Sequence, residues 1–121
     1  MNRRRGDVVL VLFPDSNMRT AKRRPALVVQ ADRLDAELPQ TIVATITSNT
    51  ARAGHASRVT VLPGGESAKA SGLSGLSGLL MASVIMTDNL ATVLYSEIDQ
   101  VIGSLRDLTE IDAALRTTLA L

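Results

Sequence analysis

Short apolar runs, each bounded by proline or glycine, make up much of the first half of the chain. Val8 to Phe13 is apolar throughout, follows Gly6-Asp7 and stops at Pro14, which predicts a strand buried on both faces. Pro25 then opens a second predicted strand, Ala26 to Gln30, because proline is tolerated where a strand begins. These runs, separated by turn residues, favour a small β-rich domain.

A third strand is predicted from Thr41 to Thr47, where the side chains alternate between the two faces of the strand. One face carries Ile42, Ala44 and Ile46, and the other carries Thr41, Val43, Thr45 and Thr47. We therefore expect one face to be core and the other to present hydroxyl groups that meet the solvent at the end of the strand.

The middle of the chain changes in composition. Ser57 to Leu62 alternates again and predicts a fourth strand, after which residues 64–78 are rich in glycine, serine and alanine. The Ser-Gly-Leu repeat from Ser71 to Leu79 is too short for a solenoid and predicts a loop or insertion. Two more strands are expected, Ser83 to Thr87 and Leu90 to Tyr95, joined by a tight hairpin turn at Asp88-Asn89.

The last segment has a helical pattern. Thr109 is a candidate N-cap with Asp112 three residues later, and the apolar side chains share one face, namely Ile111, Ala114, Leu115 and Leu119. Together the runs predict an α+β, mainly β fold, with five to six curved antiparallel strands forming a small barrel or sheet and a C-terminal helix packed on it. A length of 121 residues suits one compact domain, which we expect to span residues 1–121.

The composition restricts the available chemistry. The chain has no Cys, no Trp and one His (His55), so disulfides, thiolate zinc sites, cysteine nucleophiles and histidine pairs are excluded. Phe13 and Tyr95 are the two aromatic residues, too few for a platform that stacks several bases. Any reaction must therefore use Arg, Lys, Asp, Glu, Ser and Thr, and we expect neither a metal nor a cofactor. We also expect a cytoplasmic protein without a membrane span, because no apolar run approaches the roughly 18 residues that a span requires.

The net charge of +1 conceals an uneven distribution. Residues 1–60 hold ten basic and five acidic residues, whereas residues 61–121 hold three basic and seven acidic ones. This asymmetry is consistent with a surface for a polyanion, and equally with charges scattered over a folded surface.

Two short segments are candidates for a site. In Lys22-Arg23-Arg24-Pro25 a basic pair precedes a buried strand, and a guanidinium held there would match a phosphate with its planar fork. Thr47-Ser48 closes the third strand with hydroxyls that can hydrogen-bond phosphate oxygens. Each segment also has an ordinary interpretation, as solubilising loop arginines and as a polar turn.

The order and spacing of five segments resembles a known family. They are Arg5 to Pro14, Arg24 to Val29, Ile46 to Ser48, Asp88 to Val93 and Val101 to Leu105. In this succession the chain is similar to the MazF/PemK family, the ribonuclease toxins of type II toxin–antitoxin modules. The resemblance implies an SH3-like barrel with a C-terminal helix, a homodimer, metal-independent cleavage of single-stranded RNA and inhibition by a cognate antitoxin protein.

The resemblance also assigns residues. It places the family's catalytic arginine on Arg24, which would stabilise the phosphorane formed when a ribose 2′-OH attacks the adjacent phosphate, and its threonine on Thr47, which would orient that phosphate. The residues expected to contact RNA are Arg19, Lys22, Arg23, Ser48, Arg52, Arg58 and Asp88.

Two positions depart from the family pattern. Met86 stands where some relatives have an arginine, and the segment Pro14–Lys22 lacks the Glu-Gln of many relatives, which leaves the general base unassigned. Asp88 has a structural explanation as a turn residue beside its functional one. Two alternatives therefore stay open, namely a gyrase-poisoning toxin like CcdB with the same barrel, whose C-terminal Trp-Gly-Ile this chain lacks, and a catalytically inactive RNA-binding barrel.

Overall fold

The computed structural model describes residues 4–14, 19–32, 34, 39–61 and 82–121. The strands are β1 (Asp7–Pro14), β2 (Ala21–Val28), β3 (Gln40–Thr47), β4 (Arg58–Val61), β5 (Ser83–Leu94) and β6 (Ile98–Ser104). Two short 3-10 helices, η1 (Thr50–Arg52) and η3 (Tyr95–Glu97), and the helix α2 (Thr109–Leu119) complete the described elements. The Ser71–Leu79 repeat and the predicted loop at 64–78 lie outside the described residues.

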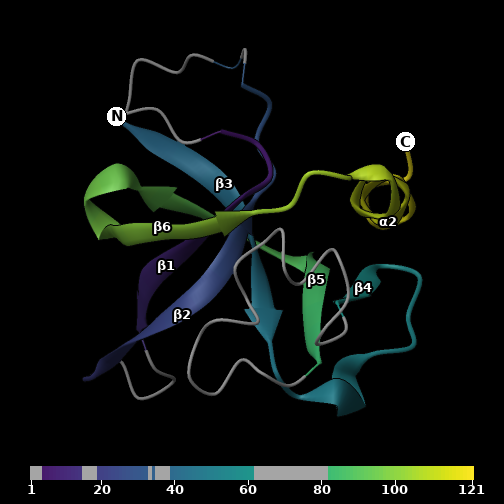
Figure 1. Cartoon of the computed structure of the whole chain (residues 1–121), viewed down its shortest axis with the longest axis horizontal. Helices are drawn as coiled ribbons and strands as arrows, with labels where there is room; N and C mark the ends of the chain where they lie inside the picture. Colours follow the sequence, from purple (N-terminus) through teal and green to yellow (C-terminus); the bar gives the residue numbers. More distant parts are fainter. Residues whose placement is uncertain (1–3, 15–18, 33, 35–38, 62–81) are drawn as a thin grey trace.

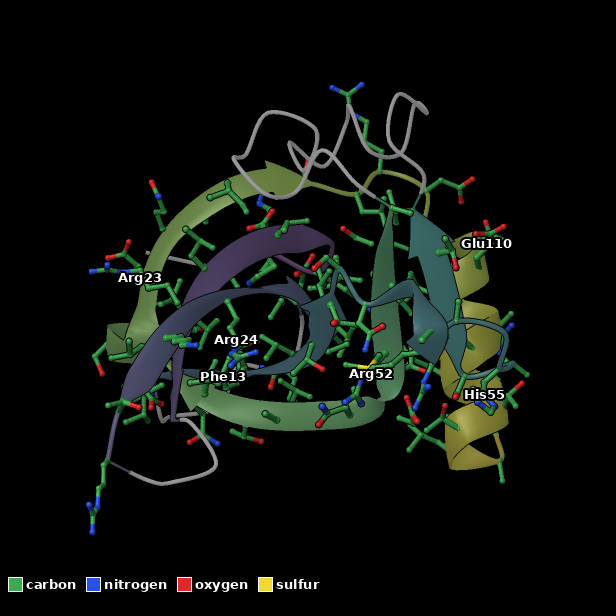
Figure 2. All side chains as sticks on the ribbon, turned by 90° about the horizontal axis from the view of Figure 1, so that it is seen from below. Phe13, Arg23, Arg24, Arg52, His55 and Glu110 are labelled. Atoms are coloured by element: carbon green, nitrogen blue, oxygen red, sulfur yellow. The ribbon has the colours of Figure 1, made fainter. Side chains whose placement is uncertain are left out.

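The six strands form one antiparallel sheet in the order β4-β5-β3-β2-β1-β6 (Figure 1). The sheet curls strongly, as Figure 2 shows, but its edge strands β4 and β6 are not paired with each other in the described part of the chain. The mainly β fold with curved antiparallel strands and a C-terminal helix is therefore confirmed, as an open sheet rather than a closed barrel.

Each face of the sheet carries its own core. One cluster, which includes Val8, Leu27 and Ile85, also contains Ile111 and Ala114 of α2, and so fixes the helix on β4 and β5. The other cluster lies on the opposite face and includes Val9, Val11 and Val43. Burial of this apolar surface on both faces is the main force that holds so thin a sheet in a curled shape.

The predicted alternation of β3 is confirmed, because Ala44 and Ile46 belong to the cluster under the helix and Val43 belongs to the other. The face of β3 that carries the hydroxyls is buried at the start of the strand. Thr41 is only 2% exposed, because the second core cluster covers this face. Near the end of the strand Thr45 and Thr47 line a pocket, and Thr47 is partly exposed.

The second strand begins earlier than predicted. β2 starts at Ala21, and Pro25 lies inside it opposite Leu10 of β1. Because β3 pairs with β2 only at residues 26–28, β2 has one neighbour rather than two at Pro25. This is the edge-like position in which a strand tolerates the missing N–H of proline.

The predicted hairpin at Asp88-Asn89 is wrong. Residues 83–94 form the single strand β5, and both of its halves pair with β3 in the same direction. The register passes from Thr45 opposite Met86 to Ala44 opposite Leu90, so residues 87–89 form a bulge that bends the strand. Polar residues that suit a turn also suit such a bulge, which is why the local sequence is ambiguous.

The C-terminal helix begins at Thr109 as its first helical residue, so the N-cap is Leu108 and not Thr109. The carboxylate of Asp107 accepts a hydrogen bond from the Thr109 N–H at 3.0 Å, which takes over the capping function. Asp112 is used elsewhere, in an ion pair with Arg5 at 2.7 Å. Leu119, predicted on the apolar face, is 50% exposed. No helix among residues 4–14, 19–32, 34, 39–61 and 82–121 is long and apolar enough to cross a membrane.

Candidate RNA-cleaving site

A pocket opens where strands β2 and β3 separate. Their pairing ends at Ala26 opposite Thr45, and beyond this point the two strands diverge. Side chains two residues apart on a strand share a face, so Arg24 projects on the side of Ala26, and Thr47 on the side of Thr45. Arg24 and Thr47, the two predicted catalytic residues, therefore lie on the two arms of the same fork and line the same pocket.

The pocket has a volume of about 380 Å³ and a cationic character. Its described lining is Phe13, Arg24, Thr45, Ile46, Thr47, Arg52, Met86, Asn89 and Ala91. Figure 2 shows Arg24 beside Phe13 on the inner side of the curled sheet, with Arg52 of η1 to the right of them. Two guanidinium groups and no carboxylate belong to this lining, so it attracts an anion.

Local hydrogen bonds arrange the hydroxyl at the pocket. The Thr47 Oγ1 accepts a hydrogen bond from the Asn49 N–H at 3.1 Å, and the Asn49 Oδ1 accepts one from the Ala51 N–H at 3.1 Å. Side chains that bond to backbone two residues on are typical of tight polar turns. Because Thr47 accepts this bond, its hydroxyl proton is directed away from the turn and can be donated to a phosphate oxygen.

Arg58 and Asp88 lie outside the pocket lining and bind each other. The Arg58 Nη2 is 3.0 Å from the Asp88 Oδ2, and its Nε is 3.3 Å from the Oδ1, a two-point contact. The hydrogen bond from Arg58 lowers the pKa of the Asp88 carboxyl, which therefore stays ionised at neutral pH. An ionised Asp88 is poorly suited to act as a general acid.

The other residues predicted to contact RNA are not in the pocket lining. Arg23 is on the outer side of the sheet, where its Nε lies 3.3 Å from the Asp99 Oδ2 (Figure 2). Arg19, Lys22 and Ser48 are exposed. The structure thus groups Arg52 with the predicted catalytic residues and leaves the remaining positions around the pocket or away from it.

Comparisons with known proteins identify the family of this chain. Residues 4–119 match the family model of the PemK-like, MazF-like toxins of type II toxin–antitoxin systems. The chain belongs to this toxin family. The resemblance inferred from the sequence is confirmed. A search of curated proteins gives no significant match.

Solved structures with the same fold include other toxins. A mycobacterial endoribonuclease in complex with its cognate antitoxin is 20% identical, with 99% of this chain and 97% of that chain covered and a TM-score of 0.70. MazF-mt6 of Mycobacterium tuberculosis is 23% identical, with 95% and 97% covered and a TM-score of 0.65. A chain of a MazE–MazF crystal structure from Deinococcus radiodurans is 23% identical, with 100% of this chain and 98% of that chain covered and a TM-score of 0.69.

Two residues of the toxin's pocket, Phe13 and Asn89, were missed by sequence reasoning. Thr45 also lines the pocket, and the alternation of the third strand had placed it on the same face as Thr47 without giving it a role. The period-2 pattern of the first strand could have pointed to Phe13, since it shares a face with Val11. Asn89 could not have been found this way, because its position depends on the β5 bulge. The Thr45 Oγ1 is also buried without a hydrogen-bond partner among the described residues.

Met86, which replaces the arginine of some relatives, is part of the pocket wall. It pairs with Thr45 of β3 and Arg58 of β4 and is only 6% exposed, so it acts as an apolar floor. No three His, Cys, Asp or Glu side chains within the described ranges come close enough to hold a metal ion. Arginine, threonine and asparagine are thus the polar groups available in the described lining.

Proposed function

We propose that this toxin is an endoribonuclease that cleaves single-stranded RNA by transesterification. The ribose 2′ oxygen forms a bond to the adjacent phosphorus while the bond from phosphorus to the 5′ oxygen breaks, which leaves a 2′,3′-cyclic phosphate and a 5′-hydroxyl. The single observation that carries the proposal is the meeting of Arg24, Thr47 and Arg52 in one pocket without a carboxylate in its described lining. Family membership and the endoribonucleases among the similar structures support it.

In this reaction Arg24 stabilises the charge that develops on the phosphorane oxygens. A guanidinium offers two parallel N–H donors, which match two phosphate oxygens. Thr47 donates its hydroxyl proton to one of these oxygens and so fixes the phosphate in line with the attacking 2′-OH. Arg52 supplies a second positive charge for the same phosphate or its neighbour.

The protons of this reaction have no obvious carrier in the described lining. None of its side chains titrates near neutral pH, because it contains neither a histidine nor a carboxylate. We therefore propose that water accepts the proton of the 2′-OH and returns one to the leaving 5′ oxygen. Catalysis then depends on positioning and on charge stabilisation, which together can account for several orders of magnitude in rate.

The direct test is cleavage of a long single-stranded RNA in EDTA. We expect cleavage by the wild type and a product with a 2′,3′-cyclic phosphate, detected by mass spectrometry. Thr47→Ala should lower kcat by about tenfold or more and change KM little, since the hydroxyl acts mainly in the transition state. Thr47→Ser keeps the hydroxyl and serves as the matched control. An unchanged rate in Thr47→Ala would remove this residue from the site.

The same assay decides between the alternatives. Binding of RNA without cleavage would favour an inactive RNA-binding barrel, for which Met86 in the pocket wall is the specific observation. Neither binding nor cleavage would direct attention to a gyrase-poisoning activity. We further propose that residues 1–121 act as one domain, that the toxin works as a homodimer in the cytoplasm, and that a cognate antitoxin blocks the pocket.

A further inference from the structure

Arg58 joins two segments beside the pocket, namely the 3-10 helix η1 and the bulge of β5. Its Nε and Nη2 donate to the Asp88 carboxylate, and its Nη1 donates to the Arg52 backbone carbonyl at 2.6 Å. One guanidinium therefore connects the 3-10 helix η1 with the bulge of β5. The Arg58 side chain is 18% exposed and that of Asp88 is 37% exposed, so the guanidinium is the better shielded partner of the pair.

The backbone of Arg52 is held from two sides. Its carbonyl accepts the bond from Arg58, and its N–H donates to the Asn49 carbonyl at 3.1 Å. Asn49 in turn is bonded to Thr47, which lines the pocket. No hydrogen bond or ion pair of the Arg52 guanidinium is formed with residues 4–14, 19–32, 34, 39–61 or 82–121, so its direction depends on this backbone anchoring.

The bulge that carries Asp88 is itself anchored. The Thr87 N–H donates to the Ser57 carbonyl at 3.0 Å, and the Thr87 hydroxyl donates to the same carbonyl at 2.5 Å. That hydroxyl also lies 2.8 Å from the Thr118 hydroxyl of α2. Asp88 is thus a fixed acceptor, and Arg58 transmits its position to Arg52.

We propose that Arg58 and Asp88 form a positioning pair that aims the Arg52 guanidinium into the RNA-cleaving pocket. The inference rests on the proposed function and gives both residues a task other than contact with RNA. Charge favours this role, because a phosphate approaching Arg58 would have to displace an ionised carboxylate that already occupies two of its donors. Asp88 beside an RNA phosphate would also be repelled.

The test is a double-mutant cycle in the cleavage assay. Arg58→Gln removes the charged donor and should lower kcat by about tenfold. Arg52→Ala removes the aimed group and should lower kcat by about tenfold to a hundredfold. If Arg58 acts through Arg52, adding Arg58→Gln to the Arg52→Ala variant changes kcat by less than about twofold. Arg106→Gln, which removes an exposed arginine from outside the site, is the matched control and should retain wild-type rates.

Arg58→Lys separates positioning from simple stabilisation. A lysine can pair with Asp88, but a single ammonium lacks the planar fork that reaches the carboxylate and the Arg52 carbonyl together. We expect the melting temperature to return close to that of the wild type while kcat stays reduced about tenfold. Full recovery of kcat in Arg58→Lys would overturn the proposal, as would additive effects of Arg58→Gln and Arg52→Ala, which would indicate direct contact of Arg58 with RNA.

A measurement without RNA tests the positioning pair separately from the proposed function. Amide hydrogen exchange of residues 49–57 should accelerate about tenfold in Arg58→Gln and stay unchanged in Arg106→Gln. Unchanged exchange in Arg58→Gln would overturn the positioning pair even if the toxin cleaves RNA. A wild type that cleaves no RNA would instead refute the proposed function, whatever the exchange rates are.

Discussion

Arg5 and Arg24 each precede a residue with unusual backbone behaviour, a glycine with positive φ and a proline with fixed φ, but the two arginines lie in different environments. Arg5 precedes Gly6, and its guanidinium is bonded to the Asp112 carboxylate at 2.7 Å and to the Val29 carbonyl at 2.9 Å. Arg24 precedes Pro25, is exposed and lines the pocket at the fork of β2 and β3. The first arginine fastens the segment before β1 to α2 and to the end of β2, and the second faces the space that a substrate would occupy.

The comparison shows that the role of an arginine depends on residues that lie far from it in the sequence. Asp112 lies 107 residues from Arg5 along the chain, so the sequence around Arg5 does not predict this ion pair. Residues 4–7 form a tight turn before β1, in which the Arg4 N–H donates to the Asp7 carboxylate at 3.0 Å and the Asp7 N–H donates to the Arg4 carbonyl at 3.0 Å. Substitutions at the two arginines should therefore affect different properties.

The largest expected effect is on activity. Arg24→Gln should lower kcat/KM for RNA by about 10²–10³-fold, because a donor aimed at the transition state is lost, and should leave the melting temperature nearly unchanged. Arg5→Gln should do the reverse, lowering the free energy of unfolding by about 1 kcal/mol, a modest value because Asp112 is 42% exposed, with kcat retained. Urea unfolding and the cleavage assay measure the two properties. Equal stability losses in both variants would break the comparison.

Gly6→Ala should have the next largest effect, on stability alone. Gly6 has a φ of +94°, and a Cβ there would lie 2.8 Å from the Leu105 carbonyl oxygen. Strain and this clash should lower the free energy of unfolding by about 2–3 kcal/mol. Gly54→Ala is the control, since its φ is +92° but nothing lies within 4 Å of its Cβ. Similar losses in both variants would attribute the effect to φ rather than to the close approach.

A smaller effect is expected from pH. The bond from Arg58 lowers the pKa of Asp88 below its ordinary value of 3.8, so the folded state favours the ionised form. This contribution to stability is present above the unfolded pKa and is lost as the pH falls through the lowered folded pKa. Between about pH 5 and pH 2 the melting temperature of Asp88→Asn should therefore fall less than that of the wild type. Parallel curves would show that the ion pair contributes nothing to folding.

Asp107 gives the matched control for this titration. Its pKa is also lowered, by hydrogen bonding to Thr109 at the start of α2, but it does not belong to the Arg58–Asp88 positioning pair. Asp107→Asn should flatten the acid limb of the stability curve without changing kcat. The Asp88 variant should change both, which distinguishes a helix cap from a residue that positions the site.

The smallest effect concerns the pocket wall. Thr45→Val replaces a buried hydroxyl that has no partner among the described residues with a methyl group of similar size. We expect the free energy of unfolding to rise by up to about 1 kcal/mol, since the cost of an unsatisfied polar group is removed. Unfolding in urea checks this. A loss of RNA cleavage together with the gain in stability would instead assign the Thr45 hydroxyl to substrate binding.

Local patterns predicted the first and third strands well, because a continuous apolar run and an alternating run are both properties of the local sequence. The shared face of Thr45 and Thr47 followed from period 2, and the family motif pointed to Arg24. The bulge at residues 87–89 could not be predicted, since Asp-Asn suits a hairpin as well as a bulge. The decision lies in β3, which pairs with both halves of β5.

The different roles of Arg52 and Arg58 could not be predicted from the local sequence either. Arg52 and Arg58 are six residues apart and look equivalent in the sequence. The structure separates them through Asp88, which lies 30 residues from Arg58 and takes up its guanidinium. Pro25 gave a similar difficulty, because the end of the β2–β3 pairing determines where a proline is tolerated within β2.

The fastening of Arg5 to α2 has a consequence for synthesis on the ribosome. The Gly6 carbonyl accepts a hydrogen bond from the Leu105 N–H, and the Arg5 guanidinium is bonded to Asp112. The segment before β1 therefore lacks these partners until residues 105–112 have left the ribosome. The core cluster under the helix likewise stays open until Ile111 and Ala114 arrive. Under the proposed function, a nascent toxin would complete its fold only after residues 105–114 have left the ribosome. The message being translated would be spared during that interval.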